Sequence, residues 1–283
     1  MPTLTASITN ALTIDVEDYF QVSAFERNIT KADWGNYPCR VENNIHTILE
    51  ILQAKDITAT FFTLGWVAEK FPSMIREIVS HGHEIASHGM SHVRVTTQTK
   101  HEFKKDVINS KKLLEDIAGT EVKGYRAASF SINESNMWAL EVLLETGHIY
   151  SSSVYPVKHD LYGMPSAPRF PYRANSSSVL EIPISTVKLF GKNYPCGGGG
   201  YFRLYPYLLQ RKAIETVNTR DKKPFIFYFH PWEVDLQQPR IKGLSAKTKF
   251  THYLNLNKME SKLNKLVTDF KWSRMDHVFS SYL

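Results

Sequence analysis

Three carboxylates stand together directly after the apolar run at residues 11–15, in the stretch Asp15-Val-Glu17-Asp18. Charges this close repel one another unless a cation or an arginine offsets them. A solvated turn whose acidic side chains cap a helix would give the same pattern. Taken alone, the stretch fits a cation or ion-pair site and a plain surface turn equally well.

Two histidines, His88 and His92, follow the predicted strand at residues 84–87. Three residues separate them, a spacing that puts both imidazoles on one side of a helical turn and suits one metal ion. A single histidine would more often belong to the core or the surface. A spaced pair beside Gly89 favours a metal site.

His230 follows five apolar or aromatic residues and should lie at the mouth of a buried strand. It could be a structural histidine bonded to the backbone, or a general acid held in a partly dry site.

Arg126 ends another predicted strand. Its guanidinium could hold a carboxylate in the ionised form through paired hydrogen bonds, and a plain salt bridge would be compatible with that role.

These residue types are sufficient for the hydrolysis of an amide. A carboxylate and two histidines leave open positions on a zinc-like ion, as catalytic sites require. Such an ion polarises a carbonyl oxygen and lowers the pKa of bound water to roughly 7. A second carboxylate would be the base and a separate histidine the acid. We expect one divalent metal ion, Zn²⁺ first, with Co²⁺, Ni²⁺ or Fe²⁺ as alternatives.

The elements that must position these residues alternate along the chain in a way typical of parallel α/β folds, in which loops after the strands converge on one face. We expect strands at 11–15, 58–63, 84–87, 124–126, 150–153, 179–184 and 225–229, and a short one near the C-terminus. We expect helices at about 41–55, 72–81, 98–118, 134–146, 207–219 and 257–270, and a long ordered loop at 155–173. The pattern predicts one barrel-like domain over residues 1–283.

The formal net charge is +6, but the basic residues are spread out, without a stripe or a nucleic-acid module. We therefore expect no nucleic-acid partner, whereas an acidic polymer or a membrane surface stays open. No apolar run is long enough to span a bilayer, and the first ten residues lack an apolar signal core. We expect a cytoplasmic protein, or a periplasmic one if an export signal was removed, with Cys39 and Cys196 as unpaired thiols. The oligomeric state is not indicated.

From about residue 10 to residue 230, the motifs fall in the order of the polysaccharide deacetylases, carbohydrate esterase family 4, which share the NodB homology domain. Asp15-Val-Glu-Asp-Tyr-Phe20, the run 197–203 and Phe229-His-Pro-Trp-Glu233 resemble the subgroup associated with exosortase and exopolysaccharide loci. The resemblance implies a distorted (β/α) barrel with about seven parallel strands. Its NodB-like core would cover about 10–235, completed by a C-terminal helix and strand. The implied reaction is metal-assisted hydrolysis of N-acetyl groups on a polysaccharide or oligosaccharide.

The resemblance also implies residue roles. Asp15 resembles the base that takes a proton from the metal-bound water, and Arg126 the arginine that orients this base. His88 and His92 resemble the two metal-binding histidines. His230 resembles the histidine that protonates the departing amine.

The third metal ligand is where this sequence departs from most of the family, because Val16 stands in place of a second aspartate. Relatives with an Asp-x-Asp arrangement select Glu17, and strand alternation puts Glu17 on the same face as Asp15. A turn that starts at Val16 would select Asp18 instead. We favour Glu17.

The sugar pocket departs as well, because Arg126-Ala-Ala-Ser129 lacks the aromatic residue that the family often has there. The oxyanion would be held by the metal and by a backbone N–H near Ser129. Phe130, Tyr201 or Trp232 would line the pocket. We expect these aromatic side chains to be exposed, which favours a sugar substrate: Tyr172, Tyr201, Phe202 and Trp232.

Two other functions compete with the hydrolysis of N-acetylhexosamine units. One is hydrolysis of a non-sugar amide or ureide, which some members of the wider superfamily perform. The other is glycan binding without catalysis on the same fold. A binding module has no use for a base, an acid and a ligand set together, so the residue set disfavours it.

Overall fold

Parallel strands form the frame of the structure, a computed structural model that describes residues 8–159 and 162–283. The eight strands of the sheet are β1 (Thr9–Val16), β2 (Thr60–Thr63), β3 (Glu84–Ser87), β4 (Gly124–Tyr125), β5 (Tyr150–Ser151), β6 (Leu180–Glu181), β9 (Ile226–Phe229) and β10 (Lys271–Ser273). Seven of them follow the order β9-β1-β2-β3-β4-β5-β6, and β10 pairs with the start of β1. Every pair in this sheet is parallel.

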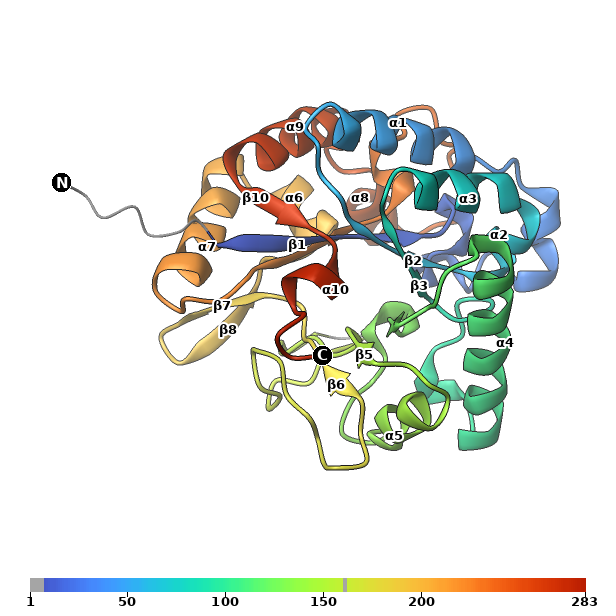
Figure 1. Ribbon diagram of the computed structural model, residues 1–283. Helices are drawn as coiled ribbons and strands as arrows, with labels where there is room; N and C mark the ends of the chain where they lie inside the picture. The colour runs from blue at the N-terminus through green and yellow to red at the C-terminus, as the bar shows by residue number, and fades with distance from the viewer. Residues whose placement is uncertain (1–7, 160–161) are drawn as a thin grey trace.

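Most helices lie outside the curled sheet, whereas the short α10 lies within the curl, as Figure 1 shows. They are α1 (Val41–Gln53), α2 (Gly65–Lys70), α3 (Pro72–Ser80), α4 (Lys100–Ala118), α5 (Trp138–Glu145), α6 (Gly199–Leu204), α7 (Tyr207–Thr219), α8 (Ala246–Tyr253), α9 (Met259–Asp269) and the short α10 (Met275–Val278). The sequence specifies the ends of α4 clearly. Thr99 and Glu102 form a capping box at its start, and Gly119 adopts the left-handed conformation after its end.

The expected fold class is confirmed: the chain forms a single α/β domain with a curled, half-barrel sheet of parallel strands. Every predicted strand and helix exists, with bounds that differ by a few residues. Elements that the sequence did not predict are α2, α6, α8, α10 and an antiparallel hairpin of β7 (Thr186–Leu189) and β8 (Lys192–Pro195). These elements are short, and α6 begins with two glycines, which have a low intrinsic helix propensity.

Successive residues of each strand point to opposite faces of the sheet and so build two cores. Ile14, Phe61 and Phe227 pack outward against the helices. Phe62 and Tyr228, one position farther along their strands, pack inside the curl. The strands are therefore buried on both faces, which explains why they read as continuous apolar runs.

The N-terminal end of the strands is covered by the C-terminal segment of the chain. The backbone N–H of Met275, at the start of α10, donates to Oγ1 of Thr60 over 2.7 Å.

Cys39 and Cys196 are both free thiols. Within the described residues, no helix combines the length and the apolar character needed to cross a membrane.

Glu84 is a buried carboxyl group at this end of the sheet. It accepts hydrogen bonds from the hydroxyls of Thr60, at 2.5 Å, and Tyr150, at 2.9 Å. Burial raises the pKa of Glu84 well above its usual value, and the nearby charge of Asp276 adds to the effect. The folded protein therefore holds a proton on Glu84 at pH values where the unfolded chain has lost it.

We predict that Glu84 makes the protein less stable as the pH rises. Above the ordinary glutamate pKa of 4.5 the unfolded chain ionises first, so the free energy of unfolding falls until the pH passes the raised folded pKa. The loss is about 1.4 kcal/mol for each unit of pKa shift. Urea unfolding of the wild type and of Glu84→Gln at several pH values measures it. The stability of Glu84→Gln relative to wild type should increase with pH, and that of the exposed control Glu50→Gln should stay constant. If the free energies of unfolding of Glu84→Gln and of the wild type changed in parallel with pH, this account would be contradicted.

Candidate functional site

Strand alternation brings four of the predicted site residues to the inner face of the sheet, at the C-terminal ends of the strands. Val16 packs in the outer core, so Asp15 and Glu17 on either side of it point inward. His88 follows β3 in phase with the inner residue Ala86, and His230 follows β9 in phase with Tyr228.

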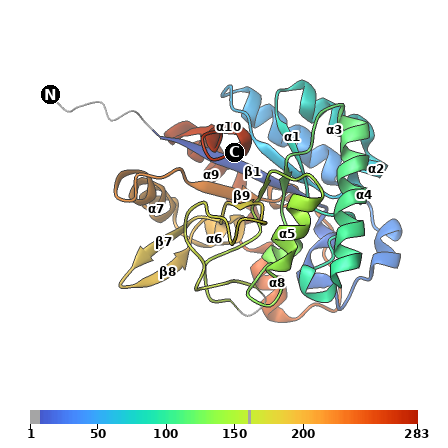
Figure 2. The same cartoon turned by 60° about the horizontal axis from the view of Figure 1, so that its bottom comes forward.

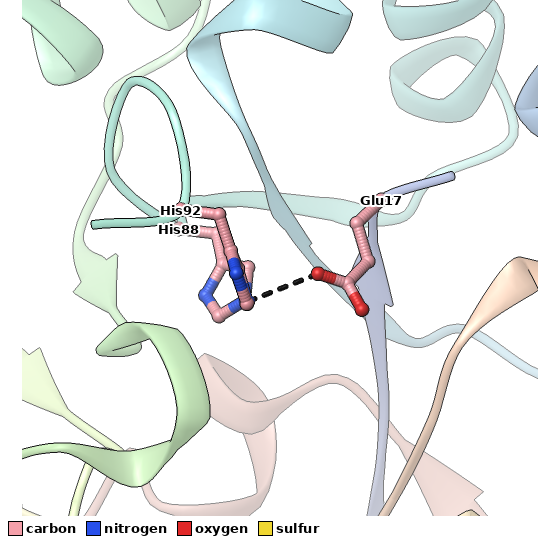
Figure 3. Close-up of side chains that lie close together, drawn as sticks. All are labelled: Glu17, His88 and His92. Atoms are coloured by element: carbon pink, nitrogen blue, oxygen red, sulfur yellow. Dashed lines mark ion pairs between the residues drawn. The ribbon is translucent and has the colours of Figure 1, made fainter. Parts of the chain in front are cut away.

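Glu17, His88 and His92 form a buried cluster in which one ligand atom from each lies within 4.8 Å of the others (Figure 3). Nε2 of His92 is 3.0 Å from Oε2 of Glu17. The two imidazoles converge without the predicted helical turn. Gly89 and His92 have positive φ angles of 77° and 54°, so the segment is a tight loop that folds His92 back towards β1.

The tautomer of His88 is set by its backbone partner. Its Nδ1 lies 2.8 Å from the carbonyl oxygen of Arg126. A carbonyl only accepts hydrogen bonds, so Nδ1 must carry the hydrogen and Nε2 keeps a lone pair. Burial lowers the pKa of His88 to about 4, which keeps the ring neutral. A neutral imidazole with a free Nε2 is the form that binds a metal ion.

Glu17 carries an unsatisfied buried charge. Although His92 is close, Oε2 of Glu17 receives no hydrogen bond of good geometry from the described part of the chain. Burial alone would raise the pKa of Glu17, but the charges of His92 and His230 lower it to about 2. An ionised, buried oxygen facing two imidazoles is an environment that a divalent cation would complete. The residues present therefore fit a metal ion.

Asp18, the alternative ligand, does not lie in this cluster. Its Oδ2 accepts from the backbone N–H groups of Arg40, at 2.6 Å, and Val41, at 3.0 Å, at the start of α1. Its Oδ1 accepts from the backbone N–H of Tyr19. Burial raises the pKa of Asp18 to about 6 in spite of these bonds. Asp18 thus fastens the loop after β1 to α1.

Asp15 forms a buried ion pair with Arg126, with 2.6 Å between Oδ1 and Nη1. The guanidinium also donates to Oγ1 of Thr13 and to the carbonyl oxygen and hydroxyl of Ser152. It lies over the ring of Phe62, 4.0 Å from the centroid. Arg126 is completely buried, so both its position and the orientation of the Asp15 carboxylate are fixed.

His230 is hydrogen-bonded to Glu233, which forms an ion pair with Arg203, and the sequence analysis did not predict this arrangement. Its Nδ1 lies 2.9 Å from Oε1 of Glu233, and Glu233 in turn accepts from Nε of Arg203 over 2.7 Å. Burial alone would lower the pKa of His230, but the bond to Glu233 and the charge of Glu17 raise it to about 9. Burial would raise the pKa of Glu233, yet the charge of Arg203 and the bond to His230 lower it to about 2. His230 is therefore a cation with a fixed orientation.

A sequence signal for Glu233 did exist. Glu233 stands three residues after His230, with proline at the first position of the short helix between them. That is the spacing of a capping box, and the Glu233 side chain also accepts from the backbone N–H of His230. No comparable local pattern connects Arg203 to Glu233, because the two are far apart in the chain.

The glycine run 197–200 makes room for the Glu233 side chain and its partners. A Cβ atom on Gly199 would lie 2.2 Å from Oε1 of Glu233, and one on Gly198 would lie 2.6 Å from the hydroxyl of Tyr228. A Cβ on Gly200 would meet no atom within 4 Å. The missing side chains let α6 approach β9 closely enough for Arg203 to reach Glu233.

A pocket of 230 Å³ joins the base, the histidine cluster and His230. Of the predicted substrate-binding residues, Ser129, Phe130 and Trp232 line it. Ser129 and Phe130 both adopt left-handed backbone conformations, with φ angles of 53° and 49°. The lining includes all of these residues: Asp15, Glu17, His88, His92, Ser129, Phe130, Tyr162, Tyr228, His230, Trp232 and Glu233.

The predicted exposure of the aromatic residues needs correction. Phe202 is fully buried against Phe227, with 4.9 Å between the ring centroids, because α6 turns it into the core. Trp232 is also buried, although it borders the pocket. Tyr201 does not line the pocket but hydrogen-bonds to Tyr162, which does.

The fold and this buried site define an α/β protein with a candidate hydrolytic metal centre. Residues 33–145 match the polysaccharide deacetylase family, and residues 152–280 match a domain of unknown function, DUF3473. Less than half of the chain is thus similar to the polysaccharide deacetylases.

Curated relatives match parts of the chain. A peptidoglycan-N-acetylglucosamine deacetylase of Bacillus cereus is 35% identical over 95 residues, which is 33% of this chain and 34% of the relative. A peptidoglycan deacetylase of Helicobacter pylori is 28% identical over 113 residues, which is 40% of this chain and 38% of the relative. The chain thus spans little more than a third of the length of these relatives.

Solved structures share the fold over nearly the whole chain. A candidate polysaccharide deacetylase from Mycobacterium smegmatis superposes with a TM-score of 0.64 and 19% identity, covering 98% of this chain and 92% of that one. An allantoinase superposes with a TM-score of 0.60 and 15% identity, covering 97% and 90%.

We predict that Glu17, and not Asp18, is needed for zinc binding. Glu17→Gln should weaken Zn²⁺ affinity more than about 100-fold, because even loss of an outer-shell partner costs 10- to 100-fold. The matched variant Asp18→Asn should bind Zn²⁺ normally but lose about 2 kcal/mol of stability, since its amide keeps only one acceptor oxygen for the backbone N–H groups that both carboxylate oxygens serve. Titration calorimetry and urea unfolding measure the two effects. Weak zinc binding in Asp18→Asn would move the ligand assignment to that residue.

A second prediction concerns Gly199. Gly199→Ala should displace the Glu233 carboxylate and so remove the main interaction that raises the pKa of His230. The pKa of His230, followed by NMR titration of the metal-free protein, should fall by about one unit or more. The neighbouring Gly200→Ala is the matched control and should leave it unchanged, because an added Cβ meets nothing there. Equal pKa values in the two variants would rule out this role of the glycine.

Proposed function

We propose that this protein is a metal-dependent deacetylase that hydrolyses N-acetyl groups on N-acetylhexosamine residues of a bacterial polysaccharide. The observation that carries the proposal is the content of one pocket. An arginine-bound carboxylate, a cluster of Glu17 with two histidines, and a cationic His230 all border the same 230 Å³ space. These are a base, a metal-ligand set and an acid, which amide hydrolysis requires together.

Glu17, His88 and His92 would hold the divalent cation, with Zn²⁺ as the first candidate. When bound, such an ion polarises the acetyl carbonyl and lowers the pKa of water. Two imidazoles and one carboxylate also suit cobalt, nickel or iron, so availability would decide among these metals. The His88 imidazole is suited to binding a metal ion, because its ring is neutral and its orientation is fixed by the hydrogen bond to the Arg126 carbonyl.

Asp15 is the proposed base. Arg126 binds Oδ1 of Asp15, so Oδ2 is the oxygen that would take the proton from the attacking water. The other hydrogen bonds of Arg126 fix its guanidinium, which in turn keeps the Asp15 carboxylate aimed into the pocket. A backbone N–H near Ser129 would help to stabilise the oxyanion, since Ser129 borders the pocket.

His230 is the proposed acid. Its raised pKa keeps the imidazole protonated at neutral pH, and Glu233 holds Nδ1, so Nε2 is left to give its proton to the departing amine. Nε2 points towards the ligand cluster, 3.6 Å from Oε1 of Glu17. The side chain of His230 keeps 21% of its surface exposed, which a proton donor to a substrate needs.

The substrate assignment rests on the relatives and on the pocket. The relatives in Bacillus cereus and Helicobacter pylori are named as deacetylases of peptidoglycan. Phe130, Tyr162 and Trp232 provide ring surfaces beside the pocket on which a sugar could stack. A second hollow of 240 Å³ shares Val22 and His92 with the pocket, which gives a polymer room beyond one sugar unit. A role in exopolysaccharide biosynthesis would fit the motifs that resemble that subgroup.

We predict that acetate release from N-acetylglucosamine oligomers depends on the metal, on Asp15 and on His230. Chelation should abolish release and Zn²⁺ should restore it. Asp15→Asn and His230→Ala should lower kcat by about 10²-fold or more, because each removes a proton-transfer group. The matched controls are Asp116→Asn and His101→Ala, which alter exposed residues of α4 and should keep full activity.

Two outcomes would overturn this function. Acetate release that chelation does not affect would exclude the metal-dependent mechanism. Turnover of allantoin, with no release from any acetylated glycan at full metal occupancy, would assign the protein to ureide hydrolysis instead.

A further inference from the structure

The hairpin β7–β8 projects from the fold (Figure 2). Phe190 is 97% exposed and Leu189 is 46% exposed. Leu189 pairs with Lys192, so Phe190 and Gly191 form a two-residue turn, and both have positive φ angles, 47° and 77°. Such turns favour Asn-Gly, and a bulky aromatic residue with positive φ is conformationally costly. Folding therefore gives no reason for a phenylalanine here.

Two hydrogen bonds hold the hairpin at the pair Lys188–Asn193, one step from the turn. Nδ2 of Asn193 donates to the carbonyl oxygen of Pro156 over 2.9 Å, and Nη1 of Arg220 donates to the carbonyl oxygen of Lys188 over 3.0 Å. The turn is thus presented by a fixed support. Its apolar side chains face water only because nothing in the described chain covers them.

Beside the hairpin lies a cavity of 870 Å³ with basic walls. Lys158, Arg169, Lys188 and Lys192 line it, and within residues 8–159 and 162–283 no aspartate or glutamate does. Arg169 is paired with Asp221 at 2.8 Å, so the three lysines supply most of the net charge. The cavity is therefore suited to anionic groups.

We propose that the β7–β8 hairpin is a membrane-docking element that recognises anionic phospholipid surfaces. Phe190 and Leu189 would enter the boundary between headgroups and acyl chains. Lys188 and Lys192, which flank the turn, would lie at the level of the lipid phosphates, and the basic cavity would receive headgroups. Apolar tips framed by basic side chains bind membrane surfaces by this combination of burial and attraction.

The exposed apolar residues Leu189 and Phe190 at the turn favour a membrane over a soluble acidic glycan as the partner. A soluble polyanion would be bound by the lysines of the cavity alone, and an exposed phenylalanine at the turn would add little. A bilayer offers both an anionic surface and an apolar layer directly beneath it. The cavity is also connected to the proposed active site by packing, since its lining residue Val157 belongs to the same core cluster as Phe130 and Tyr228, which line the catalytic pocket. Membrane docking would be detected by binding alone and does not depend on the proposed activity.

The test is co-sedimentation of the full chain with phosphatidylcholine vesicles, with and without about one third phosphatidylglycerol. The wild type should bind the anionic vesicles and bind less at high salt. Phe190→Asn suits the left-handed turn and should weaken partitioning about tenfold. Lys188→Gln combined with Lys192→Gln should weaken it roughly twenty-fivefold, at about fivefold for each lysine. The control Leu236→Asn, which alters a residue 59% exposed beside Asp235, should have no effect.

Three results would overturn the proposal, provided that thermal unfolding shows the variants to be folded. The first is a wild type that does not bind anionic vesicles at low salt. The second is Phe190→Asn binding as well as the wild type, which would leave only non-specific charge attraction. The third is a soluble polygalacturonate that binds as tightly as the vesicles and equally well to Phe190→Asn, which would assign the cavity to an acidic glycan.

Discussion

Arg126 is the residue on which the arrangement of the site depends. Its side chain binds Asp15, and its carbonyl oxygen holds Nδ1 of His88, so one residue orients both the proposed base and one of the proposed metal ligands. Removing one partner of a buried pair leaves an uncompensated charge, at a cost of about 3–5 kcal/mol. The bonds from Arg126 to Thr13 and Ser152 also connect β1 to the strands β4 and β5. Stability and the geometry of the site are therefore coupled at this position.

The buried carboxylates of the pocket differ in how their charges are balanced. Asp15 faces Arg126, and Glu233 faces Arg203. Glu17 faces His92 and His230, its Oε1 accepts from Nε1 of Trp232, and its Oε2 lacks a good hydrogen bond within the described residues. The other two carboxylates each bind an arginine, which is a permanent cation, whereas Glu17 has no arginine partner among the described residues. Glu17 is thus the acidic group of the pocket that a bound cation would complete, and this explains why a metal site is proposed here rather than at Asp15 or Glu233.

The sequence could predict the strands and the residues that follow them, because burial on both faces leaves long apolar runs and alternation fixes which side chains point inward. Asp15 and Glu17 were found in this way. Alternation did not reveal that Asp18 fastens the loop to α1, since that depends on where the distant residue Arg40 lies. The turn between His88 and His92 was wrongly expected to be helical, although Gly89 offered a hint of a left-handed backbone.

Longer-range features could not be predicted from local patterns. Arg203 meets Glu233 only because the glycine run lets α6 approach β9, and the same approach buries Phe202, which was expected to be exposed. The hairpin β7–β8 was missed because its turn, Phe190-Gly191, lacks the Asn-Gly signal. Its unusual residue is informative for that reason, since local preferences are most often broken at positions that serve a function.

The site also explains how the two matched segments of the chain are related. Residues 33–145 supply His88, His92 and Arg126, whereas residues 152–280, which match a domain of unknown function, supply His230 and its partner Glu233. Neither segment contains the proposed base, which lies in β1 ahead of both. β1 pairs with β2 from one segment and with β9 from the other, so this strand joins the two halves of the sheet. The segment of unknown function therefore completes the pocket, because without it the pocket would contain the proposed metal-ligand set but not the proposed acid.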